Sequence, residues 1–80
     1  MSTATVYIVT PFRPGARGSL APGEPRRCSS EAEAMRAADA MMLRARGVIV
    51  LRQQEDPQVD FFGEPSVIAR RGDVPEIALD

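Results

Sequence analysis

Four arginines in one short stretch are the side chains best suited to binding chemistry. Within residues 11–28, Glu24 is the only acidic residue. A guanidinium group binds phosphate or carboxylate through paired hydrogen bonds, and nearby glycines allow backbone amides to form an anion nest. A loop with solvated arginines is the simpler interpretation, and contact with a partner or an anion is the functional interpretation of the same residues. The candidate residues are Arg13, Arg17, Arg26 and Arg27.

The remaining residue types exclude most catalytic chemistry. The chain has no histidine and no lysine, so the usual general base, the commonest transition-metal ligand and the Schiff-base amine are all missing. Its single cysteine, Cys28, cannot form a disulfide within the chain or a cysteine metal cluster. Ser29 and Ser30 have no histidine or lysine to activate them, and they are better explained as helix caps. We therefore expect no catalytic residues, no cofactor and no metal, and we predict that the protein is not an enzyme.

Three acidic residues spaced four apart could supply oxygen ligands to calcium or magnesium. They are Asp56, Asp60 and Glu64, and Pro57 and Gly63 between them disfavour a regular helix. The segment also lacks the pattern of a twelve-residue calcium loop. A solvated acidic loop is the interpretation that we adopt.

The net charge of −1 is a cancellation between two oppositely charged parts of the chain. Residues 1–52 hold eight arginines against four acids, and residues 53–80 hold two arginines against seven acids. Such asymmetry can steer the basic loop of one subunit onto the acidic segment of another. It also fits a nucleic-acid contact confined to the first part. A pI near 5.4 and the scarcity of aromatic residues near the arginines argue against nucleic acid.

The helix is the element with the strongest local signals. Ser30 and Glu33 form a capping box, in which each side chain accepts a hydrogen bond from a backbone amide at the helix start. Gly47 is expected to end the helix in a left-handed conformation. Apolar residues at helical spacing predict its buried side; they are Met35, Ala38, Met42 and Ala45.

The other elements follow from β-branched runs and from the proline and glycine residues that interrupt them. We predict one small domain over residues 1–80. Its elements are a strand over 5–10, a proline-, glycine- and arginine-rich loop over 11–28, a helix over 30–46, a strand over 48–53, an acidic loop over 54–65, a strand over 66–71 and a tail over 72–80.

These elements predict an α+β fold: a small three-stranded, mainly antiparallel sheet with one helix, in the order β-α-β-β. One helix covers one face of such a sheet, and the other face also carries apolar residues. An exposed apolar face favours association, so we expect a homodimer. The sequence contains no apolar run of bilayer length and no signal segment, and with a single thiol this predicts a cytoplasmic protein without membrane contact.

Several short motifs resemble those of a group of short uncharacterised bacterial proteins, mostly from proteobacteria. The motifs are VYIVTPFR at 6–13, GSL at 18–20, PGEPR at 22–26, EA at 31–32, GV at 47–48 and ARRGDVPE at 69–76. The resemblance implies no known activity, so it transfers no functional residues. It implies that the 11–28 segment is more than a connector.

The functional expectation is a non-enzymatic, cytoplasmic, homo-oligomeric interaction or accessory protein, which binds itself and a protein partner not identified by the sequence. The alternative is a nucleic-acid or anion-binding module that uses the loop arginines. A small enzyme is the third possibility.

Overall fold

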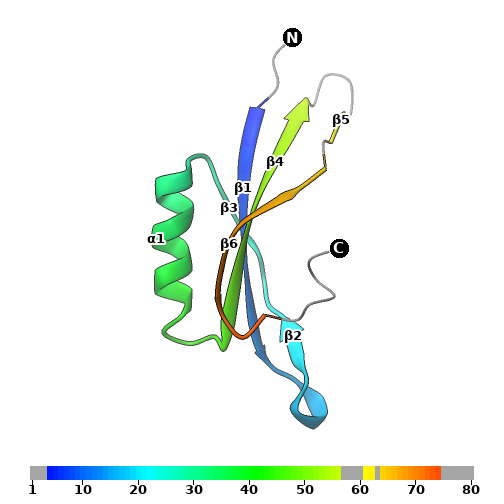
Figure 1. Ribbon diagram of the computed structural model, residues 1–80, viewed down its shortest axis with the longest axis vertical. Coiled ribbons are helices and arrows are strands. Elements are labelled where there is room, and N and C mark those ends of the chain that lie inside the picture. Colours follow the sequence, from blue (N-terminus) through cyan, green and yellow to red (C-terminus); the bar gives the residue numbers. More distant parts are fainter. Residues whose placement is uncertain (1–3, 57–60, 63, 75–80) are drawn as a thin grey trace.

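A computed structural model of the chain describes residues 4–56, 61–62 and 64–74. It shows one helix packed against one face of an antiparallel sheet (Figure 1). The predicted α+β class with a single helix is confirmed for the described residues, but the prediction of three strands is wrong, because the described part of the sheet contains six. The elements are β1 (Ala4–Pro14), the 3-10 turn η1 (Ala16–Gly18), β2 (Leu20–Pro22), β3 (Arg26–Cys28), α1 (Glu31–Met41), β4 (Gly47–Asp56), β5 (Phe61–Phe62) and β6 (Ser66–Gly72).

Strands β1 and β4 form the centre of the sheet. They pair antiparallel from Ala4 opposite Glu55 to Phe12 opposite Gly47. Strands β2 and β3 pair with the outer side of β1, and β5 and β6 pair with the outer side of β4. Because β3 and β4 are both antiparallel to β1, they run parallel to each other. Helix α1 therefore connects two parallel strands that are separated by β1.

The segment predicted as an irregular loop over 11–28 is largely a folded return strand. Strand β1 continues through Pro14, and the chain turns at η1 and runs back along β1 as β2 and β3. The break between β2 and β3 falls at 23–25, where Gly23 donates its backbone N–H to the carbonyl oxygen of Pro11 at 2.7 Å. The prolines and glycines thus interrupt the return strand without preventing it.

Two further boundaries differ from the prediction. The helix ends at Met41, five residues before the predicted end, and a turn leads into β4. Gly47 is not a left-handed helix terminator; it is the first residue of β4 and pairs with both Phe12 and Gly72. Strand β4 extends to Asp56, so it takes in the start of the predicted acidic loop. Most of the predicted tail lies outside the described residues.

The start of the helix has the predicted Ser30 cap, whereas the contact of Glu33 is shifted by one residue from the prediction. The backbone N–H of Glu33 donates to Ser30 Oγ at 3.1 Å. The carboxylate of Glu33 accepts from the backbone N–H and the hydroxyl of Ser29, both at 3.3 Å, one residue before the cap. Both halves of the motif therefore fix the direction in which the chain enters the helix.

Removal of the cap should weaken the fold measurably. We expect Ser30→Ala to lower the free energy of unfolding by about 1 kcal/mol, because an amide of the first turn loses its acceptor. Ser30→Asp keeps an acceptor oxygen and should retain most of that stability. Urea denaturation followed by circular dichroism measures both variants. Equal midpoints for Ser30→Ala and Ser30→Asp would contradict this role of Ser30.

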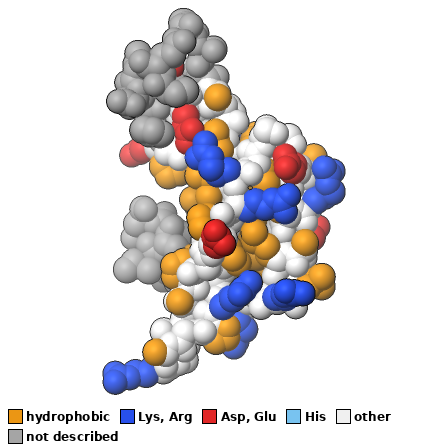
Figure 2. Space-filling view, turned by 180° about the vertical axis from the view of Figure 1, so that it is seen from behind, with side chains coloured by type: hydrophobic (Ala, Val, Ile, Leu, Met, Phe, Trp, Pro, Cys, Tyr) orange, Lys and Arg blue, Asp and Glu red, His pale blue; other side chains and the backbone are white. Residues whose placement is uncertain are grey.

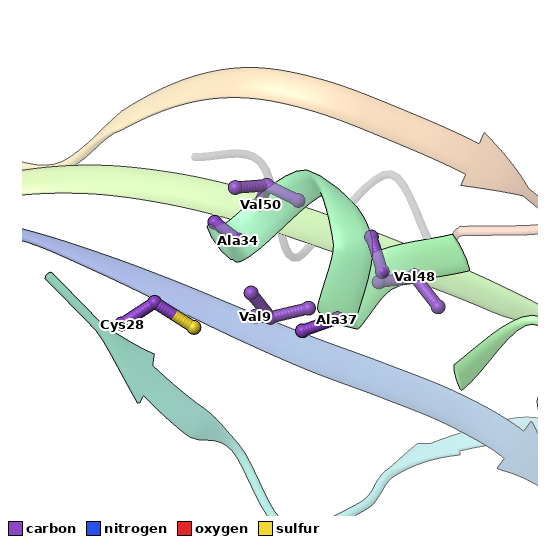
Figure 3. Close-up of a cluster of buried hydrophobic side chains, with 7 residues drawn as sticks. Val9, Cys28, Ala34, Ala37, Val48 and Val50 are labelled. Atoms are coloured by element: carbon purple, nitrogen blue, oxygen red, sulfur yellow. The ribbon is translucent and has the colours of Figure 1, made fainter. Parts of the chain in front are cut away.

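The core lies between α1 and the sheet and consists of small side chains. Val9, Val48 and Val50 are fully buried, and Cys28 lies beside them (Figure 3). The helix contributes alanines at 34, 37 and 38, and these allow its backbone to approach the strands closely. A register shift in β6 opposite Val50 and Leu51 places both Ile68 and Ala69 against this cluster.

Candidate functional site

A row of apolar side chains lies on the face of the sheet away from α1. The register pairs Ile8 with Leu51 and Leu51 with Val67, so these side chains are neighbours across β1, β4 and β6. Val9, which follows Ile8, belongs to the cluster beneath the helix, and successive strand residues point to opposite faces. We call Val6, Ile8, Leu51 and Val67 the open face.

The open face occupies only part of that side of the sheet. Its four side chains are half-buried. Toward the Gly47 end, Phe12 and Ile49 point to the same side but are only 5% and 2% exposed. The exposed apolar surface is therefore smaller than the sequence predicts, and it is concentrated near the row of Ile8 and Leu51.

A salt bridge crosses the sheet beside the open face. Arg27 lies on β3 opposite Ile8, and Glu55 lies on β4 opposite Ala4. The two guanidinium nitrogens of Arg27 donate to the two carboxylate oxygens of Glu55 at 2.9 and 3.2 Å. The pair thus spans β1 next to Val6.

The guanidinium group of Arg27 keeps its positive charge to strongly alkaline pH. Its hydrogen bond with Glu55, followed by the carboxylate charge, raises the pKa of the Arg27 guanidinium above its usual value. A raised pKa means that the contribution of Arg27 is complete below its unfolded pKa and is lost only as the pH rises through the folded pKa. Alkaline titration up to that range should therefore leave the contact in place.

The structure separates the four predicted arginines. Arg26 and Arg27 are successive residues of β3, so they point to opposite faces of the sheet. Arg13 pairs with Ala21 near the end of β1, about 13 Å along the strand from the position opposite Arg26. Arg17 lies in η1 with a left-handed backbone, φ 61°.

No common patch results from this arrangement. In Figure 2, the arginine side chains of the displayed face are dispersed among acidic and apolar groups. Of the four candidates, Arg27 already has a carboxylate partner. A single anion site formed by all four arginines is therefore not assembled by this fold.

The cysteine lies in the core, and the described acidic residues Asp56 and Glu64 lie at or near strand ends. Cys28 is 4% exposed and packs within the core cluster. Asp56 ends β4, Glu64 precedes β6, and Asp60 lies outside the described residues. Within 4–56, 61–62 and 64–74, no group of three or more His, Cys, Asp or Glu side chains could hold a metal ion. In the same part of the chain, no helix has the length and apolar character needed to cross a membrane.

A cleft between β3 and α1 brings together two arginines that the sequence did not connect. Arg26 pairs with Val9, so it points to the helix side of the sheet, and Arg36 lies on the helix. The spacing of helix residues places Glu33 and Ala40, which are three and four positions from Arg36, on the same side of the helix as Arg36. No local pattern indicates that β3 lies beside that side. The cleft has a volume of about 400 Å³ and is lined by Arg26, Ser30, Glu33, Arg36, Ala37 and Ala40.

No protein-family model, curated protein or solved structure matches the chain significantly.

Proposed function

We propose that this chain is a non-enzymatic interaction protein of the cytoplasm, which assembles with a second copy of itself through the open face. The observation that carries the proposal is the half-exposed row of Ile8, Leu51 and Val67. Apolar side chains aligned across three strands gain stability when a second surface removes them from water.

The protection of the sheet edges supports stacking by faces over pairing by edges. Edge strands avoid mutual pairing through bulges, charged side chains, prolines and short length. Strand β6 carries a register shift and the charged pair Arg70 and Arg71. Strands β2 and β3 have three residues each and are separated by a segment that contains Pro25.

The charges beside the open face also suit a symmetric contact. In a two-fold dimer the same patch meets itself. Arg27 and Glu55 pair within each copy, so each copy would bring a neutral ion pair to the margin of the interface, and like charges would not oppose each other there.

Sedimentation velocity with matched leucine variants tests the proposal. We expect the wild-type protein at micromolar concentration to sediment as a dimer of twice 8.7 kDa. Leu51→Gln removes an apolar contact from each copy and should weaken dimerisation at least about tenfold. Leu43→Gln changes a leucine that is 85% exposed and lies outside the open face, so it should leave the dimer intact.

A second variant separates loss of the dimer from loss of folding. Val67→Thr keeps the shape and the strand preference of valine and should also weaken the dimer while the circular dichroism spectrum stays unchanged. A wild-type monomer at these concentrations, or a folded Leu51→Gln variant that remains as dimeric as Leu43→Gln, would refute the assignment.

A further inference from the structure

The cleft between β3 and α1 holds two arginines, Arg26 and Arg36, that form no ion pair with any carboxylate of the described residues. The ion pairs within the described residues join Arg27 to Glu55, Arg46 to Asp73 and Arg71 to Asp39. In that part of the chain neither Arg26 nor Arg36 takes part in an ion pair, and both side chains are exposed. Two guanidinium groups that line one cleft produce a local positive potential that an anion can neutralise.

The acidic residue of the cleft is already engaged. One carboxylate oxygen of Glu33 accepts two hydrogen bonds from Ser29 at the start of the helix. Its charge partly offsets the arginines, and the lining keeps an excess of one positive charge. The helix begins at the cleft, with Ser30 as its N-cap and as a lining residue, so the positive end of the helix dipole adds positive potential there.

The volume of the cleft and its lining residues indicate the class of ligand that it binds. A volume of about 400 Å³ falls within the range of small-molecule sites and exceeds what a phosphate ion alone requires. Ala37 and Ala40 offer a small apolar surface beside the arginines. Guanidinium groups bind phosphoryl oxygens through paired hydrogen bonds.

We propose that Arg26 and Arg36 bind the phosphoryl group of a small phosphate ester in this cleft, with its organic part against Ala37 and Ala40. A polynucleotide is the less favoured occupant, because Arg13 and Arg17 lie elsewhere and do not extend the cleft into a basic track. The site does not use the open face, so it does not depend on dimerisation.

Titration of the ¹⁵N-labelled protein with inorganic phosphate and with phenyl phosphate, at constant ionic strength, tests this site. We expect saturable shifts of the amides of Arg36, Ala37 and Ala40, and tighter binding of phenyl phosphate than of inorganic phosphate. Arg26→Gln and Arg36→Gln should each weaken binding about tenfold, because each removes charge-assisted hydrogen bonds.

Two further variants make the outcome specific. Arg44→Gln removes an exposed arginine that lies outside the cleft and should leave the affinity unchanged. Glu33→Gln removes the opposing negative charge while glutamine can still serve the capping box, so it should strengthen binding severalfold.

Several results would contradict the proposed phosphate-ester site. Shifts that do not saturate, an equal loss in Arg44→Gln, or no preference for phenyl phosphate over inorganic phosphate would each overturn the assignment of a phosphate ester. Tighter binding of single-stranded DNA than of phenyl phosphate, weakened alike by Arg13→Gln and Arg17→Gln, would identify a polynucleotide surface instead.

Discussion

Gly47→Ala should leave the protein largely unfolded at room temperature. A Cβ atom at this position would overlap the backbone carbonyl of Asp73. The backbone has little freedom to move away, because Gly47 pairs with both Phe12 and Gly72, and the N–H of Asp73 donates to the carbonyl of Arg46 at 3.0 Å. We expect a loss of about 3–5 kcal/mol, comparable to the whole stability of so small a domain.

A second glycine provides the control for this effect. Gly18 has a φ of +79° and no atom within 4 Å of the position that a Cβ would take. Gly18→Ala should therefore cost only the strain of a left-handed alanine, about 1 kcal/mol. Thermal unfolding followed by circular dichroism compares the two variants. Similar melting temperatures for Gly47→Ala and Gly18→Ala would show that the contact with Asp73 relaxes freely.

The second large effect is expected from Ala38→Leu. Ala38 is fully buried in the cluster between α1 and the sheet, where it faces valines on β1 and β4. A leucine there would force the helix away from the strands or into strained rotamers, at a cost of about 3 kcal/mol. The distance between α1 and the sheet therefore depends on the small size of the side chain at position 38.

Ala32→Leu serves as the matched control for this substitution. Ala32 lies on the same helix but is exposed, and leucine has nearly the same helix propensity as alanine. Its free energy of unfolding should stay within about 0.5 kcal/mol of the wild type. If guanidinium denaturation gave the same midpoint for Ala38→Leu and Ala32→Leu, the interface beneath α1 would be more adaptable than its burial indicates.

The sequence predicted the features that depend on neighbouring residues. The capping contacts of Ser30 and Glu33 involve residues at most four apart, so their types and spacing were sufficient. The β-branched runs marked β1, β4 and β6 for the same reason. After the helix, the backbone N–H of Arg46 donates to the carbonyl oxygen of Phe12 at 2.8 Å. This contact joins residues 34 positions apart, so no local pattern records it.

Features that depend on register could not be predicted in this way. Strands β2 and β3 have three residues each and contain proline and arginine, and they exist because β1 offers them a pairing edge. The same register decides that Arg26 points toward α1 and Arg27 toward Glu55. Without it, Arg26 and Arg27 were two members of one group of four arginines, and Arg36 was not connected to that group.

The position of β1 between β3 and β4 has a consequence for the order of folding. The contacts of β1 with β2 and β3 join residues at most 21 positions apart, such as Tyr7 and Cys28. Its contacts with β4 reach from Ala4 to Glu55, a separation of 51 positions. Because closing a longer loop costs more chain entropy, the first half of the sheet can form early. Completion of the sheet requires the long-range pairing of β4 with β1, and we expect this step to limit the folding rate.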